Sequence, residues 1–165
     1  MSSQTELAYP PHAAASAAPA AAQRRIDALL QHYGESHTHP SNERIHFVAI
    51  PLIMLSLVGM LYGASPWVAY LFMAASLVYY VRLSVPFLLA MALITGAMLG
   101  VVVALDHAGI LWRSCAVIFV VAWIFQFIGH KIEGRKPSFL EDIQYLWVGP
   151  LFVLSRLFLQ LGLRW

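Results

Sequence analysis

The sequence predicts an all-α, polytopic membrane helical bundle, and three observations favour this fold class. Of 165 residues, 60% are hydrophobic and 11% are charged, whereas a soluble domain averages about 45–50% and about 25%. Four long apolar runs each approach the roughly 20 residues that cross a bilayer as a helix. The single cysteine, Cys115, excludes a disulfide scaffold. We therefore expect one helical membrane domain over residues 23–165 and no extensive disorder beyond the N-terminal tail.

The N-terminal segment differs in composition from the rest of the chain. Residues 1–22 are rich in Ala, Pro and Ser and lack the Leu-rich stretch of an export signal, which predicts a disordered tail. Apolar residues then recur at helical spacing up to Tyr33, and Gly34 is placed to end a helix. Residues 23–33 therefore predict a short amphipathic helix at the membrane interface.

The four apolar runs predict the membrane-spanning helices. They cover residues 45–62, 66–81, 86–105 and 110–129. Pro66 and Pro86 begin two of them, in the first helical turn, where proline is tolerated. A fifth apolar stretch, residues 145–161, is interrupted by Gly149-Pro150 and carries Arg156. This stretch spans the membrane, re-enters it or lies flat on it.

The positive charges predict the orientation in the membrane. Lys and Arg are retained on the cytoplasmic side during insertion. With a cytoplasmic N-terminus, Arg113 alone falls in an outer loop, and the inner segments hold Arg24, Arg25, Arg44, Arg82, Lys131, Arg135 and Lys136. We therefore expect a cytoplasmic N-terminus, with Tyr80 and Trp147 at the inner interface. The Ala-rich tail and compact chain favour a bacterial inner-membrane protein, with the endoplasmic reticulum as the location if the source is eukaryotic. No basic block is dense enough to predict a nucleic-acid partner.

Histidines gather at one predicted face of the membrane. His32, His37, His39 and His46 lie around the start of the first span, and His130 ends the fourth. The predicted topology brings these five together, while His12 falls in the tail and His107 on the opposite face. Imidazole is a good ligand for iron, zinc, copper and nickel. The pattern indicates a metal site, with interfacial histidines hydrogen-bonded to water or helix ends as the alternative.

The turn before the first span favours some of these histidines over others. Pro40 disfavours helical backbone at His39, and Ser41 or Asn42 can cap the following helix. Such a turn folds His37 back over the start of the helix, so His37 is a better neighbour for His46 than His39 is.

The end of the fourth span offers further candidates. His130 and Glu133 lie three residues apart and share a helical face, so they can supply nitrogen and carboxylate ligands. An ion pair with Arg44, Arg135 or Lys136 is the alternative for Glu133. Gln126, one turn before His130, is costly in lipid, so we expect it to face the interior and hydrogen-bond a ligand.

Two pairs of glycines have the spacing that permits close helix packing. Gly59 and Gly63 lie in the first span, and Gly96 and Gly100 in the third. We expect both pairs to pack within the bundle. The oligomeric state stays open.

Three segments of the chain resemble one protein family. HYGESHTHPSNERIHFVAIPLI, WIFQFIGHKIEGRKPSF and DIQYLWVGPLFVL are similar to the small membrane proteins that include the fungal 2-hydroxy fatty acid dioxygenase. The resemblance covers about residues 26–155. It implies iron-dependent shortening of 2-hydroxy fatty acids by one carbon, with His37, His46 and His130 as the essential histidines.

The resemblance and the residues together predict a membrane-embedded Fe(II)-dependent dioxygenase of fatty acid α-oxidation. Its substrates would be a 2-hydroxy fatty acid and O2, with the acyl tail in the bilayer. Trp123 is a candidate lining residue for the tail, with packing in the helix interior as the favoured alternative. The expected ligands are His37, His46 and His130, with Glu133 as an additional candidate. Tyr33, Asn42 and Gln126 would support them.

Two alternatives remain open at the level of the sequence. One is a di-iron lipid hydroxylase or desaturase, although two metals need about twice the ligands and the spaced histidine boxes of that class are missing. The other is a non-catalytic lipid- or metal-binding membrane protein. No phosphate loop, dinucleotide fingerprint or HExxH zinc helix is present, which makes an enzyme with a soluble cofactor a poor fit.

Overall fold

A computed structural model describes residues 25–35, 37–134, 147–163 and 165, and the regular elements in these ranges are all helices. The predicted tail over residues 1–22 lies outside the described residues, as do Arg135 and Lys136. The helices are α1 (Arg25–Gly34), α2 (Pro40–Ala64), α3 (Pro66–Val81), α4 (Val85–His107), α5 (Leu111–Glu133) and α7 (Val148–Gln160). The all-helical prediction is confirmed for this part of the chain.

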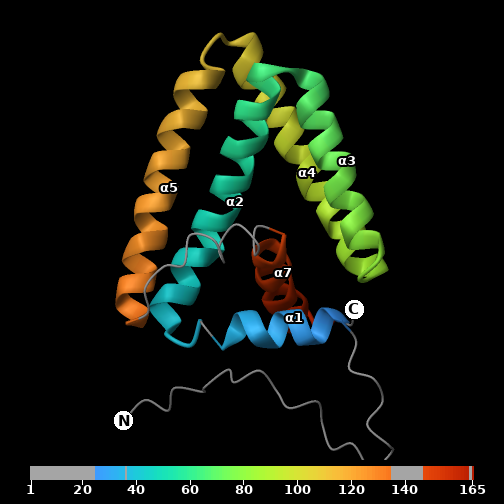
Figure 1. Ribbon diagram of the computed structural model, residues 1–165, viewed down its shortest axis with the longest axis vertical. Coiled ribbons are helices and arrows are strands. Elements are labelled where there is room, and N and C mark those ends of the chain that lie inside the picture. Colours follow the sequence, from blue (N-terminus) through green and yellow to red (C-terminus); the bar gives the residue numbers. More distant parts are fainter. Residues whose placement is uncertain (1–24, 36, 135–146, 164) are drawn as a thin grey trace, which may run out of the picture.

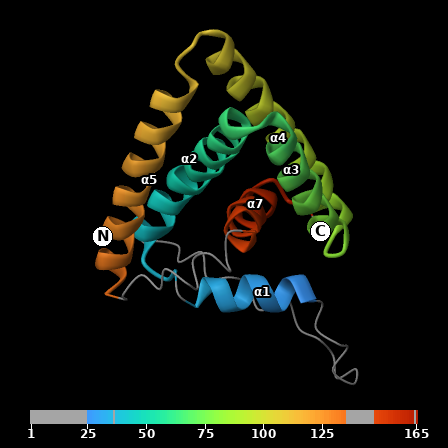
Figure 2. The same cartoon turned by 45° about the horizontal axis from the view of Figure 1, so that its top comes forward.

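The helices form two pairs that meet at one end of the molecule. α2 packs along α5, and α3 packs along α4 (Figure 1). At the opposite end α7 lies between the two pairs, and α1 crosses beneath it, as the tilted view also shows (Figure 2). The start of α2 and the end of α5 therefore lie at the same end of the molecule as α1 and α7.

Three helices, α2, α4 and α5, are long and apolar enough to cross a membrane. α3 has 16 residues and extends about 24 Å at 1.5 Å per residue, less than the roughly 30 Å of bilayer hydrocarbon. It runs beside α4 in the opposite direction (Figure 1). A fourth crossing by α3 therefore stays a prediction.

The fifth apolar stretch forms α7, which is packed inside the molecule. Its buried residues, Leu151 and Phe152 among them, share one apolar cluster with Leu30 of α1, Tyr80 of α3 and Phe87 of α4. With 13 residues, α7 extends about 20 Å, which is also short of a full crossing. Tyr80 is 1% exposed, so its ring packs inside the molecule, and its position at the inner interface stays a prediction.

Glycines allow α2 and α5 to approach closely. A Cβ atom at Gly59 would overlap the Cys115 sulfur, and one at Gly63 would press on the indole of Trp112. The prediction that Gly59 and Gly63 pack within the bundle is confirmed. The corresponding prediction for Gly96 and Gly100 was wrong, because no described atom outside their own helix lies within 4 Å of a Cβ placed there.

Candidate metal centre

Three histidines from distant parts of the chain converge at the end of the molecule where α1 lies. His37 precedes α2, His46 lies in its second turn, and His130 lies in the last turn of α5. Each offers a ring nitrogen within 4.8 Å of the other two, and their exposed fractions are 5%, 1% and 8%. The structure thus brings together the three histidines that the sequence singled out as ligands.

Backbone carbonyls fix the protonation of two of these rings. His37 Nδ1 lies 2.8 Å from the carbonyl oxygen of Tyr33, and His46 Nδ1 lies 2.9 Å from that of Asn42. A carbonyl oxygen only accepts hydrogen bonds, so each Nδ1 carries a hydrogen and donates. In a neutral ring the Nε2 atom then holds a lone pair.

The two Nε2 atoms face each other at a distance of 3.0 Å. With both Nδ1 hydrogens committed, this contact places two acceptors against each other, which is unfavourable unless a proton or a cation lies between them. Two nitrogen ligands at right angles, each roughly 2.1 Å from an ion, would be about 3.0 Å apart. The pair therefore fits a bound transition metal.

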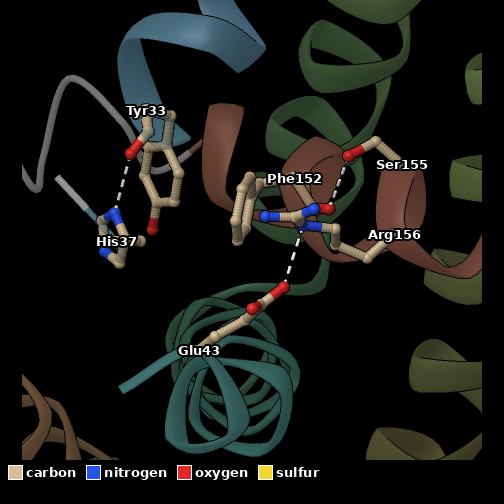
Figure 3. Close-up of polar contacts among 6 residues, drawn as sticks. All are labelled: Tyr33, His37, Glu43, Phe152, Ser155 and Arg156. Carbon is tan, nitrogen blue, oxygen red and sulfur yellow. Dashed lines mark hydrogen bonds and ion pairs between the residues drawn. The ribbon is translucent and has the colours of Figure 1, made fainter. Parts of the chain in front are cut away.

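An aromatic wall holds the His37 ring in place. The Tyr33 ring stacks on it with a centroid distance of 4.2 Å and an interplanar angle of 6°. Phe152 of α7 packs against both rings, at 5.0 Å from Tyr33 and 5.9 Å from His37. Figure 3 shows Phe152 beside Tyr33 and His37. The sequence predicted the supporting position of Tyr33 but not that of Phe152, which no spacing or motif connects to His37.

The turn before α2 separates His39 from the cluster. Pro40 occupies the first helical position, so the capping residue is His39, whose ring accepts from the backbone N–H of Ser41 at 3.1 Å. The prediction that Ser41 or Asn42 caps the helix was wrong, because both already lie inside it. His39 is exposed, and His32 is exposed and faces Glu35 at 3.7 Å. Neither belongs to the buried group.

Glu133 connects the end of α5 to this turn rather than joining the three nitrogens. Its carboxylate accepts hydrogen bonds from the backbone N–H and hydroxyl of Thr38, from the backbone N–H of His39 and from the side chain of Asn42. It lies outside the described group of potential ligands. These bonds occupy the carboxylate; an ion pair with Arg44, one of the alternatives that the sequence left open, is not present among the described residues. They place a negative charge at the N-terminus of α2, where the helix dipole favours it.

Asn42 contacts Glu133, His46 and the backbone of α5 at Gly129. Its side-chain nitrogen donates to Glu133 at 3.0 Å and its carbonyl accepts from His46. A Cβ atom at Gly129 would overlap its Oδ1 atom, so the glycine beside His130 allows α5 to approach this completely buried side chain. As predicted, Asn42 supports the site, and it does so by direct contact with His46 and Glu133.

Gln126 faces the interior as predicted, but its hydrogen bonding differs from the expectation. The side chain is 9% exposed. Its Oε1 atom is buried and has no hydrogen-bond partner among the described residues. No bond from this oxygen to a histidine is present there.

An ion pair fastens α7 to α2 next to the cluster. Arg156 Nε lies 2.8 Å from a carboxylate oxygen of Glu43, three residues before His46. The guanidinium also lies over the Phe152 ring, 5.1 Å from its centroid (Figure 3). Arg156, which the sequence presented as an oddity in an apolar stretch, thus helps to hold Phe152 against the Tyr33–His37 stack.

Comparison with known proteins identifies the family. The family model described as "2-hydroxy-palmitic acid dioxygenase Mpo1-like" matches residues 23–161. The chain belongs to this Mpo1-like family. It is 30% identical to the 2-hydroxy-palmitic acid dioxygenase MPO1 of Saccharomyces cerevisiae over 142 residues, which are 81% of this chain and 79% of the yeast protein. No solved structure matches.

In this Mpo1-like protein the matched range contains the whole candidate centre. It includes the three histidines, the turn that Glu133 holds, and the α7 residues that support His37. The resemblance found in the sequence is confirmed.

Proposed function

We propose that this protein is a membrane-embedded, Fe(II)-dependent dioxygenase that shortens 2-hydroxy fatty acids by one carbon. The contact that carries the proposal is the 3.0 Å approach of two Nε2 atoms whose rings each donate from Nδ1 to a backbone carbonyl. Metal-binding histidines characteristically donate their second ring N–H in this way. The name of the yeast relative, a 2-hydroxy-palmitic acid dioxygenase, supports the substrate class.

In this proposal each residue of the centre has a role that follows from its contacts. His37, His46 and His130 would hold the metal, and the carbonyls of Tyr33 and Asn42 would keep two of the rings in the ligating tautomer. When bound, iron(II) supplies the redox chemistry and the open positions that a 2-hydroxy acid and O2 require.

The surroundings of the histidines suit a lipid substrate. Tyr33 and Phe152 would exclude water from one side of the centre, because both are buried and pack on His37. The three histidines lie at one end of the long apolar helices. This position would let an acid headgroup reach the metal while its tail stays among the helices, on the cytoplasmic side if the charge distribution sets the orientation.

Iron content and oxygen uptake test the proposal together. Purified protein should contain close to one iron per chain and consume O2 with 2-hydroxypalmitate. His46→Ala and His130→Ala should lose both properties. His107→Ala should keep both the iron and the oxygen uptake, because His107 ends α4 at the end of the molecule far from the three histidines (Figure 1). Full turnover after complete removal of metal would overturn the proposal.

The metal stoichiometry separates this proposal from a di-iron enzyme. Among the described residues, three histidines form the one group of potential ligands that lie together, and a second iron would need about as many ligands again. Two irons per chain would favour the di-iron alternative. Bound metal without oxygen uptake would favour a non-catalytic metal-binding protein.

A further inference from the structure

Gln126 of α5 carries a buried oxygen that has no hydrogen-bond partner in the described part of the chain. The side chain is 9% exposed, and its Oε1 atom contacts no donor among the described residues. Buried polar atoms in native proteins nearly always bond to protein, to water or to a ligand, because an unmet hydrogen bond costs free energy. This oxygen therefore indicates a donor that the described residues do not supply.

The packing of α2 against α5 places Gln126 at the level of His46. The two helices run side by side in opposite directions (Figure 1), and Gly129 of α5 meets Asn42 of α2. About one helical turn from this contact, α2 reaches His46 and α5 reaches Gln126. One turn further, apolar residues of both helices pack together. Gln126 therefore lies between the candidate metal centre and the apolar part of the interface.

Gln126 also shares a face of α5 with His130. The two residues are four apart, a spacing that brings their Cβ atoms within about 5–6 Å. They keep 9% and 8% of their surface exposed, so neither is sealed completely inside the helix pair. Trp123, in the preceding turn, packs on Phe119 and Phe127 of its own helix. Gln126 is thus a polar neighbour of a candidate ligand.

The chemistry of the amide oxygen selects the group that it binds. An amide oxygen only accepts hydrogen bonds, and an ionised carboxylate also only accepts. In an ionised 2-hydroxy acid the hydroxyl is the one donor. The last torsion of a glutamine side chain is broad and roughly two-fold, so the amide can turn its oxygen toward a bound molecule without movement of α5.

Asn42 also has a buried oxygen without a partner among the described residues, but its surroundings leave no room for a ligand. Its side-chain nitrogen donates to Glu133 at 3.0 Å, which fixes the orientation of the amide. A Cβ atom at Gly129 would overlap the Oδ1 atom, so this oxygen already lies against the backbone of α5. The contrast singles out Gln126.

We propose that Gln126 is a specificity-determining residue whose Oε1 atom accepts a hydrogen bond from the 2-hydroxyl group of the substrate. The inference rests on the proposed function, because it assumes that a 2-hydroxy acid binds beside the three histidines. A site that bonds a substrate hydroxyl rejects the analogue without it, since a buried partner then stays unpaired. Gln126 thus favours 2-hydroxy acids over unsubstituted fatty acids.

Binding without oxygen tests this role apart from turnover. Calorimetry on the full-length, iron-loaded protein under anaerobic conditions should show tighter binding of 2-hydroxydecanoate than of decanoate. Gln126→Met removes the acceptor and should weaken the binding of 2-hydroxydecanoate about tenfold, the effect of one buried hydrogen bond. The affinity for decanoate should stay unchanged. Gln160→Met makes the same replacement at an exposed position and should alter neither affinity. Equal weakening for both acids, or an unchanged preference, would overturn the proposal.

Melting temperature and iron content separate a binding role from a structural one. Because Oε1 has no partner among the described residues, Gln126→Met should keep or raise the melting temperature of the ligand-free protein. Its iron content should equal that of the wild type. A lower melting temperature would show that the amide is bonded within the protein, and loss of iron would make Gln126 a metal ligand. Either result would contradict the proposal.

Oxygen uptake distinguishes failure of this inference from failure of the proposed function. If the wild type oxidises 2-hydroxydecanoate while Gln126→Met keeps the preference for the hydroxy acid in binding, the inference about Gln126 alone is wrong. If Gln126→Met loses that preference and the wild type consumes no O2, the role of Gln126 in binding is supported and the dioxygenase is rejected.

Discussion

Individual backbone carbonyls decide the chemistry of the candidate metal centre. The carbonyls of Tyr33 and Asn42 accept from His37 and His46, so both rings present Nε2 to each other. The sequence predicted the choice of His37 over His39 because the effect of Pro40 on its neighbour is local. It could not predict that Phe152 supports His37, because that contact depends on how α7 packs against α1 and α2.

Replacing the Glu133 carboxylate should loosen the centre without removing a ligand. Glu133→Gln keeps the side-chain length but places an NH2 group against donors on Thr38, His39 and Asn42. We expect metal affinity to fall about 10–100-fold, as for other residues that orient ligands, with the three histidines intact. Metal titration followed by calorimetry measures this change.

Glu35→Gln provides the control for that measurement, because Glu35 is exposed and faces only the exposed His32 among the ion pairs described. An unchanged dissociation constant in Glu133→Gln would show that the turn keeps its position without the carboxylate.

His39 should matter for stability and not for metal binding. Its ring caps α2, and removal of a capping side chain typically costs about 1 kcal/mol. His39→Ala should therefore lower the melting temperature in detergent and keep the iron content, and His39→Asp should restore the melting temperature. Loss of iron in both variants would identify His39 as a ligand instead.

At the scale of elements, the packing of α2 against α5 brings the histidines together. The two helices approach closely at Gly59 and Gly63 near one end and at Gly129 near the other. Spacing alone predicted the first contact, because Gly59 and Gly63 form a recognised pair. Gly129 carries no such signal, and the Gly96–Gly100 pair shows that the same spacing also occurs where no helix packs.

Adding a methyl group at these glycines should separate stability from metal binding. Gly129→Ala would overlap Asn42 and should lower both the melting temperature and the iron content. Gly59→Ala would meet Cys115 at the other end of α2 and should lower the melting temperature alone. Gly96→Ala has open space and should be neutral or stabilise by up to about 1 kcal/mol. Equal iron content in all three variants would contradict this account.

At the scale of the whole molecule, hydropathy correctly predicted an all-helical protein with long apolar helices. It did not determine how many of the apolar segments cross the membrane, because three helices are long enough and the crossing by α3 stays a prediction. α3 and α7 are shorter apolar helices than the three candidate spans. α7 is apolar because it packs into the cluster with α1, α3 and α4, whereas α3 leaves Trp67, Leu71 and Val78 exposed. Apolar composition alone does not distinguish a buried helix from a membrane span. α7 packs against α1 and α2, which are far from it in the sequence, and composition alone does not reveal such contacts.

Cysteine labelling tests the predicted orientation and the crossing by α3. In a Cys115→Ala background, the exposed positions Ser41→Cys and Val85→Cys lie in the first turn of α2 and at the start of α4. Both should react with an impermeant thiol reagent only from the cytoplasmic side. Ala108→Cys should react only from the other side. Labelling of Val85→Cys from the side of Ala108→Cys would show that α3 does not complete a crossing.

The separation of the three histidines along the chain has a consequence for biosynthesis. His37 and His46 leave the ribosome early, whereas His130 follows more than eighty residues later, and the supporting Phe152 later still. A chain inserted only as far as α4 thus carries two of the three nitrogens. If the three histidines bind a metal as proposed, the set of ligands is complete only once α5 has docked on α2, which would keep unfinished translation products from acquiring a reactive metal.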